Sequence, residues 1–172
     1  MWPVLLALLL LWSYGATARA ESEATVKAAY LLNFAKLVAW PASAFAEGQP
    51  LVIGVVGRGA VAEELSRAFA GASANGRKIE VRRVAANDAG ALLACHVVFV
   101  PEAERGENVI GAVRGRPVLV VGEEENFARR GGALGFVKEA GTLKFEANPK
   151  AATRNGLTVS AKLLRVARAV VD

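Results

Sequence analysis

The clearest structural signal in the chain is the stretch Val26-Lys-Ala-Ala-Tyr-Leu-Leu-Asn-Phe-Ala-Lys-Leu-Val-Ala-Trp40-Pro41. Its apolar side chains recur at the spacing of one helix face: Val26, Tyr30, Phe34, Leu37 and Val38. Ser22 or Thr25 can cap the start of this helix. We predict an end near Ala39, because the proline disfavours helical geometry in the residue before it. The stretch therefore predicts an amphipathic helix that covers a hydrophobic core.

The residues before this helix predict export. Residues 3–12 are almost wholly apolar, and Ala18-Arg19-Ala20 has the small-x-small pattern that signal peptidase accepts. We interpret residues 1–20 as a signal peptide removed after Ala20, and residues 21–172 as one domain. A permanent membrane anchor is the weaker alternative, because the apolar run is about half of the ~20 residues that a spanning helix needs.

After the helix, the chain alternates between short apolar runs and amphipathic segments. The runs predict strands at residues 51–56, 78–84, 96–100 and 118–121, and the segments between them predict helices at 60–70, 88–93 and 101–113. Such alternation is typical of an α/β fold with a mostly parallel sheet and helices on both faces.

The rhythm changes in the last third of the chain. Residues 133–138 and 142–147 flank Ala140-Gly141 and predict a late antiparallel hairpin. Asn148-Pro149 predicts a following helix, because proline suits the first helical turn. A strand at 157–159 and a final helix at 160–171 complete the prediction, the latter with an apolar face of Leu163, Leu164, Val166, Ala167 and Val170. We therefore expect a single α/β domain.

Composition limits the function classes. Removing residues 1–20 leaves 152 of 172 residues and lowers the formal charge from +5 to +4, because Arg19 is the one charged residue lost. The cations are scattered along the chain, which argues against a nucleic-acid partner. Mild basicity can help docking to an acidic protein, the anionic cell wall or a membrane surface. The single cysteine, Cys95, cannot form an internal disulfide and is interpreted as a small buried apolar residue.

Three short motifs were weighed as chemical sites. Gly54-Val-Val-Gly57-Arg-Gly59 lacks the spacing of a dinucleotide fingerprint and is interpreted as a tight turn. Cys95 and His96 are neighbours in an extended segment, so they point to opposite faces and cannot form a dyad. His96 is the only histidine, which excludes a zinc site built from several histidines. Glu123-Glu124-Glu125 lacks the spaced ligands of a calcium loop and is interpreted as a solvated loop.

We accordingly predict no catalytic residue, no cofactor and no metal ligand. A carboxylate pair drawn from distant segments, as in glycosidases, stays open, because sequence spacing cannot reveal such a pair.

The remaining candidate is a surface for a protein partner, in and after the predicted hairpin. Apolar groups edged by charges suit such a surface. Leu134 and Phe136 share one face of their strand, as Lys144 and Glu146 share one face of theirs. The alternative is that Leu134 and Phe136 merely cover the core. The predicted partner-binding residues are Leu134, Phe136, Lys144, Glu146, Asn148 and Ala152.

The chain resembles the YfiR/HmsC family in residues spread over nearly the whole predicted domain. The resemblance is carried by Val26 to Lys36 with Trp40-Pro41, and by Cys95-His96-Val97-Val98-Phe99-Val100. It continues through Gly115 to Leu119, Phe127 to Gly135, Lys144 to Asn148, and Gly156 to Arg168.

The resemblance implies a periplasmic α/β regulator without enzyme activity. Such a regulator binds the periplasmic sensor domain of an inner-membrane diguanylate cyclase and holds the cyclase inactive, which lowers cyclic di-GMP and biofilm formation. The resemblance also implies a homodimer and admits an outer-membrane protein as a second partner. The chain departs from the family pattern at Cys95, which has no partner for the disulfide that relatives carry, and at Leu32 and Leu37, where aromatic residues are expected.

A second hypothesis is a periplasmic small-solute-binding module that acts with a histidine kinase. Its ligand would lie at the carboxyl ends of the strands, near Gly57, Pro101 and Gly122.

Overall fold

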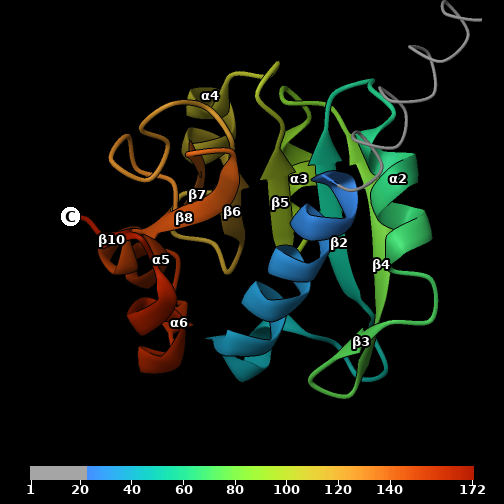
Figure 1. The fold of residues 1–172 in the computed structure, drawn as a ribbon. Helices are drawn as coiled ribbons and strands as arrows, with labels where there is room; N and C mark the ends of the chain where they lie inside the picture. The colour runs from blue at the N-terminus through green and yellow to red at the C-terminus, as the bar shows by residue number, and fades with distance from the viewer. Residues whose placement is uncertain (1–22) are drawn as a thin grey trace, which may run out of the picture.

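A computed structural model describes residues 23–172, which form one mixed α/β domain (Figure 1). The predicted signal peptide, residues 1–20, lies outside the described residues. A helix over residues 23–37 opens the fold and lies across one face of the central sheet. Within the described chain, no helix has the length and apolar character needed to cross a bilayer.

The central sheet runs in the order β10-β8-β7-β6-β5-β2-β4-β3 within the described residues. Its five inner strands β4, β2, β5, β6 and β7 are mutually parallel, and β8 and β3 are antiparallel to β7 and β4. The strands are β2 (Leu51–Val56), β3 (Ser73–Ala74), β4 (Arg77–Val84), β5 (Val97–Val100), β6 (Leu119–Gly122), β7 (Leu134–Glu139), β8 (Thr142–Ala147) and β10 (Ala169–Val170).

Two layers of helices bury the two faces of this sheet. The helix at residues 23–37 joins one hydrophobic cluster with α2 (Val61–Ala68), α5 (Pro149–Arg154) and α6 (Ala161–Val166). The other cluster contains α3 (Ala89–Leu93) and α4 (Gly106–Ala112). Strands β2 and β5 are buried at every position. Because helices cover both of their faces, their sequences are continuous apolar runs.

A small second sheet closes one end of the molecule. It pairs β1 (Val38–Ala39) antiparallel to β9 (Thr158–Val159), and a short 3-10 helix, η1 (Ala42–Ala44), follows β1. The first helix therefore ends at residue 37 rather than near Ala39, because Val38 and Ala39 find backbone partners in β9.

Two further predicted boundaries were wrong. The final helix stops at Val166, because the next residues pair with the open edge of β8. The backbone N–H of Arg168 donates to the Phe145 carbonyl at 2.8 Å, and β10 follows. Helix α4 starts at Gly106, later than the predicted Pro101, after a loop that carries Glu102 and Glu104.

The first helix runs opposite to the parallel strands, which defines two ends of the molecule. At the strands' carboxyl ends, Lys27 pairs with Glu123 at 2.6 Å. At their amino ends, the Asn75 amide donates to the Ala35 carbonyl at 3.1 Å, where Asn75 lies in the turn between β3 and β4.

Candidate functional site: the hairpin pocket

The hairpin of β7 and β8 presents a different chemistry on each of its faces. The register places Phe136 opposite Phe145 and Val137 opposite Lys144. Directly opposed residues share a face, and successive residues alternate between faces. Leu134 and Phe136 therefore face the core, whereas Lys144 and Glu146 lie on the other face. The predicted surface, which combined the two pairs, is divided between the two sides of the sheet.

On the core face, aromatic rings join the hairpin to the first helix. The rings of Phe34 and Phe145 lie 4.9 Å apart, and those of Tyr30 and Phe136 lie 5.6 Å apart, both edge to face. The Tyr30 hydroxyl donates to the Leu143 carbonyl at 2.9 Å. Edge-to-face pairs stabilise beyond the area that they bury. The helix therefore fixes the position of the hairpin.

On the opposite face, one arginine joins three segments of the chain. Arg168 donates to the Glu139 carboxylate at 2.9 Å and to the Glu146 carboxylate at 2.8 Å, and Lys144 also binds Glu139. Hydrogen bonds from Lys144 and Arg168 lower the pKa of Glu139 to about 2. Glu146 is only 4% exposed, so its bond to Arg168 offsets the loss of water around a buried carboxylate. This network holds the segment before β10 against the hairpin.

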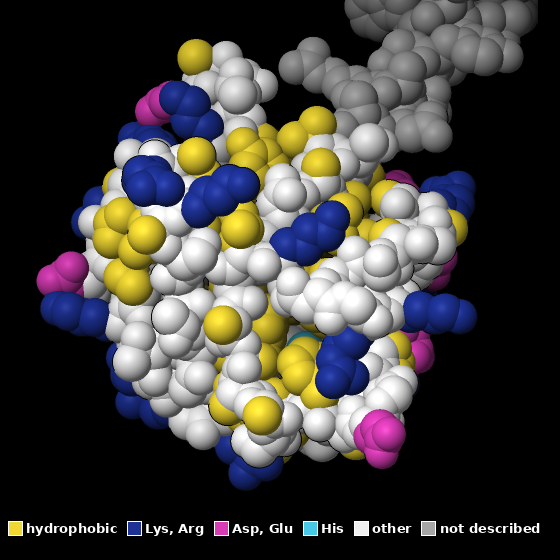
Figure 2. Space-filling model, turned by 90° about the horizontal axis from the view of Figure 1, so that it is seen from below, with side chains coloured by type: hydrophobic (Ala, Val, Ile, Leu, Met, Phe, Trp, Pro, Cys, Tyr) yellow, Lys and Arg dark blue, Asp and Glu magenta, His cyan; other side chains and the backbone are white. Residues whose placement is uncertain are grey.

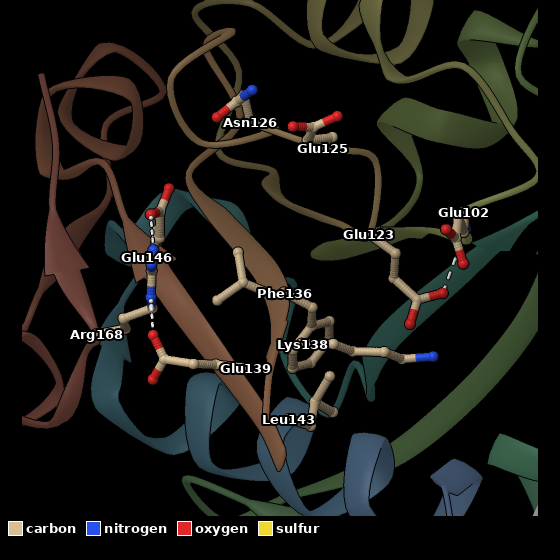
Figure 3. Close-up of a pocket in the computed structure, with 11 residues that line it drawn as sticks. Glu102, Glu123, Glu125, Asn126, Phe136, Lys138, Glu139, Leu143, Glu146 and Arg168 are labelled. Atoms are coloured by element: carbon tan, nitrogen blue, oxygen red, sulfur yellow. Dashed lines mark hydrogen bonds and ion pairs between the residues drawn. The ribbon is translucent and has the colours of Figure 1, made fainter. Parts of the chain in front are cut away.

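A pocket of about 410 Å3 lies beside this network, at the carboxyl ends of the parallel strands (Figure 3). We call it the hairpin pocket. Apolar side chains of the hairpin lie between the Arg168 network on one side and the carboxylates of Glu102 and Glu123 on the other. Its lining residues are Glu102, Glu123, Glu125, Asn126, Phe136, Val137, Lys138, Glu139, Leu143, Glu146 and Arg168.

The predicted partner-binding residues take different places around this pocket. Phe136 and Glu146 line it. Leu134 and Ala152 are fully buried, and in this conformation they support the surface from beneath without reaching it. Lys144 is half-exposed beside Glu139.

Asn148 has a clear local role that the sequence prediction did not assign. Its side chain caps α5 by accepting from the Ala151 backbone N–H at 2.8 Å. Its amide group donates to the Ala128 carbonyl at 2.9 Å. The side chain is 3% exposed, so Asn148 ties α5 to the loop before β7 from within the fold.

Comparison with models of known protein families agrees with the sequence resemblance. The model described as YfiR/HmsC-like matches residues 24–168. The chain belongs to the YfiR/HmsC-like family. This family is known for periplasmic regulators of diguanylate cyclases, and it is regulatory rather than catalytic.

The fold of this YfiR/HmsC-like chain also has a counterpart among solved structures. It is similar to the crystal structure of "the ABC domain in complex with L-Trp" from Streptococcus pneumonia, with a TM-score of 0.52 and 16% sequence identity. The match covers 70% of the chain and 55% of that structure. At this identity the likeness shows the α/β fold alone.

Two of the three positions named for a solute in the YfiR/HmsC-like chain, Gly57 and Gly122, are closely covered by its own side chains. A Cβ built on Gly57 would lie 2.3 Å from the Glu104 carboxylate, and one built on Gly122 would lie 2.4 Å from the Phe127 ring. Free space at the carboxyl ends is therefore displaced from Gly57 and Gly122 toward Glu102, Glu123 and the hairpin.

Cys95 and His96 have separate structural environments. The Cys95 thiol lies under the sheet and donates to the Ala91 carbonyl at 3.2 Å, and burial raises its pKa to about 11. The His96 ring accepts from the Val52 backbone N–H at 3.0 Å and stacks on Phe45 at 4.1 Å. Cys95 is thus a buried apolar residue, as predicted, and the two side chains form no dyad.

The three consecutive glutamates point in different directions. Glu123 pairs with Lys27, Glu124 pairs with Arg130 at 2.5 Å, and Glu125 is exposed. Residues 23–172 contain no group of three or more side chains suited to hold a metal ion. Each glutamate therefore acts separately, two of them as ion-pair partners.

The sequence prediction missed most of the residues that line the pocket, including Glu139 and Arg168, which join its charge network. Both looked like ordinary surface charges, one at the end of a predicted strand and one in a predicted helix. Their meeting depends on β10 pairing with β8, which local spacing does not reveal.

Proposed function

We propose that the protein is a non-enzymatic periplasmic regulator that binds and represses the sensor domain of an inner-membrane diguanylate cyclase. Membership of the YfiR/HmsC-like family is the observation that carries this proposal. The predicted signal peptide at residues 1–20 supports a periplasmic location. Repression would lower cyclic di-GMP and biofilm formation.

The proposed contact surface is the hairpin with the following helix, residues 134–152. Lys138, whose side chain is 61% exposed, and half-buried Leu143 lie opposite each other on one face of the hairpin, and half-exposed Lys144 lies on the other face. Leu134, Phe136, Asn148 and Ala152 hold this surface in place from the interior. A cation on each face, with Leu143 beside Lys138, suits an acidic partner surface that closes around the end of the hairpin with an apolar anchor.

The mechanism that we propose is a shift in the populations of the cyclase. A regulator that binds the inactive form better than the active form moves the equilibrium by the difference in the two binding free energies. Any signal that weakens the complex would release the cyclase.

Deleting the gene and measuring cyclic di-GMP tests this function directly. We expect cyclic di-GMP and biofilm mass to rise, and the exported protein to recover an inner-membrane cyclase from detergent extracts. Unchanged cyclic di-GMP together with recovery of no cyclase would reject the proposal.

Charge reversal on the hairpin tests the contact surface. We expect Lys138→Glu/Lys144→Glu to reduce co-purification of the cyclase at least about tenfold, which corresponds to the loss of two favourable rim charges. The matched control is Arg82→Glu/Arg83→Glu, which reverses two ion-paired cations on β4. Equal retention of the partner by both variants would exclude residues 134–152 as the surface.

We further propose a homodimer, and an outer-membrane protein as a second partner that receives the regulator when the cyclase is released. Cys95 is the single cysteine and lies buried, so an intramolecular disulfide cannot serve as the releasing signal. Sedimentation equilibrium under reducing conditions tests the dimer, and a purely monomeric protein at micromolar concentration would reject it.

A second candidate function is a small-solute-binding module that acts with a histidine kinase. The hairpin pocket of about 410 Å3 favours it, because ligand pockets commonly have such volumes. A thermal-shift screen against amino acids and cell-wall fragments tests it. A strong shift with one compound, and no protein partner recovered, would favour this candidate over cyclase repression.

A further inference from the structure

Lysines and arginines without an ion pair gather at the amino ends of the parallel strands. Six such cations lie there, and within residues 23–172 none of them takes part in a salt bridge. We call this region the basic end, and its cations are Lys36, Arg77, Lys78, Arg114, Arg116 and Lys162.

Four separate parts of the fold bring these cations together. Lys36 lies at the end of the first helix, and Arg77 and Lys78 begin β4. Arg114 and Arg116 lie in the loop before β6. The Asn155 side chain binds this loop to α5, by accepting from the Gly115 backbone N–H at 3.0 Å and donating to the Val118 carbonyl.

The fourth part is the start of α6, which carries Lys162. It is held beside the first helix, because the Ser160 backbone N–H donates to the Leu37 carbonyl at 3.0 Å. The six cations therefore occupy one end of the molecule although they come from distant parts of the sequence.

Aromatic side chains lie among these cations. The Arg77 guanidinium stands 4.3 Å from the centre of the Phe45 ring, and the Phe45 and Trp40 rings lie 6.2 Å apart. The indole N–H of Trp40 is buried and finds no acceptor among the described residues, and both rings are partly buried against the core. In Figure 2, which views the molecule from below, Lys and Arg side chains spread over this end with apolar groups between them, and Asp and Glu lie toward the outline.

At the opposite end of the molecule, most cations are ion-paired. There Lys27, Lys138, Lys144 and Arg168 each bind a carboxylate of the chain, and among the described residues only the exposed loop residues Arg58 and Arg105 are cations without an ion pair. Six unpaired cations at one end outnumber the exposed carboxylate of Glu47, in the loop whose carbonyls Arg77 binds, and leave a net positive field there.

We propose that the basic end docks the protein on a membrane surface that contains anionic phospholipid. Phosphate headgroups would bind the six cations, and the exposed edges of the Trp40 and Phe45 rings, which otherwise pack against the core, would face the headgroup layer, where aromatic side chains are favoured. Lipid fits better than a folded acidic protein, because the cations are spread over four parts of the fold and the interspersed groups include tryptophan. Docking this way turns the hairpin pocket away from the bilayer.

Binding to lipid vesicles tests the proposal with the exported protein that lacks residues 1–20. We expect it to co-sediment with phosphatidylcholine vesicles that contain about 30% phosphatidylglycerol, and to be released by about 0.5 M NaCl. It should not bind vesicles of phosphatidylcholine alone. Equal binding to both vesicle types, or binding to neither, would overturn the proposal.

A matched pair of double variants locates the binding face. Arg114→Gln/Arg116→Gln removes two exposed cations of the basic end, and each cation near an anionic surface contributes about a fivefold factor, so binding should fall about 25-fold. The control Arg58→Gln/Arg105→Gln removes two exposed arginines, also without ion pairs, from loops at the opposite end, and it should bind within about twofold of the parent. An equal loss in both variants would show that only net charge matters and would overturn the docking face.

The fluorescence of Trp40 supplies an independent measurement of binding, because Trp40 is the only tryptophan outside residues 1–20. We expect its fluorescence maximum to shift to shorter wavelength on addition of the anionic vesicles and to stay unchanged with neutral vesicles. If polyglutamate displaces the protein from the vesicles and binds it more tightly than they do, with the same dependence on Arg114 and Arg116, the face takes an acidic polypeptide and the lipid proposal fails.

Discussion

The two ends of the sheet differ in how their charges are used. At the carboxyl ends, Arg168 and Lys144 are bound to glutamates of the same chain, and the charges hold structure together. At the amino ends, six cations have no carboxylate partner within the described residues, so their charge is available to another molecule. The difference teaches that unpaired charges gathered on one face are stronger evidence for binding than charges that are already paired within the chain.

The largest expected effect comes from breaking the aromatic contact beneath the carboxyl end. We expect Phe136→Ala to lower the free energy of unfolding by about 3–5 kcal/mol, because it leaves a cavity among Tyr30, Phe34 and Phe99. Urea denaturation measures this. The control Val166→Ala, at a side chain that is 68% exposed, should change stability by less than about 0.5 kcal/mol. A small effect at Phe136 would mean that the hairpin does not depend on the first helix.

A smaller effect should follow from removing the arginine that joins the charges at this end. Arg168→Met leaves the Glu146 carboxylate buried with only Arg129 nearby, at 3.8 Å, and should cost about 1–3 kcal/mol. Lys150→Met is the matched control, because it removes one partner of the exposed pair with Asp172 and should cost less than about 1 kcal/mol. Equal costs would show that the Arg168 network contributes no more than a surface pair.

A third effect, at the amino end, depends on pH. Burial, with the nearby Arg77 charge, lowers the pKa of His96 below its usual value. The unfolded chain then binds a proton more readily than the folded protein, so stability is complete above the ordinary histidine pKa and falls as pH decreases below it. We expect stability to fall between pH 7 and 5.5, with a slope no steeper than the limit of about 1.4 kcal/mol per pH unit for one group.

His96 is the only histidine, so this dependence can be assigned without ambiguity. In urea titrations across that range, His96→Asn should flatten the curve while lowering its overall level, because the contacts with Val52 and Ala44 change. A parent protein that becomes more stable as the pH falls through this range would contradict the assignment.

The smallest expected effect concerns the stability of the basic end. Arg114→Gln/Arg116→Gln should alter the free energy of unfolding by no more than about 0.5 kcal/mol, as should Arg58→Gln/Arg105→Gln. Neither pair makes an ion pair that folding would lose. Thermal denaturation checks this, and a large loss at Arg114 and Arg116 would show that the basic end has a structural function like that of the opposite end.

Most of the fold could be predicted from local pattern. The apolar run at Leu51–Val56 matches β2 residue for residue, because a strand covered on both faces has no polar position. The hairpin was signalled by Ala140-Gly141, whose backbone has positive φ at both residues, as a tight turn of this kind requires. These features depend on residues that are close in sequence, so the local sequence pattern predicts them.

The candidate site was less predictable, because it depends on contacts across the fold. Alternation correctly paired Leu134 with Phe136, and Lys144 with Glu146, but which pair faces the core is fixed by the position of the first helix. The residues of β10 continue a helical apolar pattern, and only the open edge of β8 makes them a strand. No local sequence pattern therefore predicts that Arg168 is part of the site.

One further consequence follows from the ring of Phe127. A Cβ built on any of Gly106, Gly122 or Gly132 would lie within 2.4 Å of that ring, which leaves no room for a side chain at three positions far apart in sequence. Substitutions at the three glycines therefore depend on the size of the side chain at position 127. Across relatives, a larger residue at any of the three glycines should be found only where a smaller one has replaced the phenylalanine.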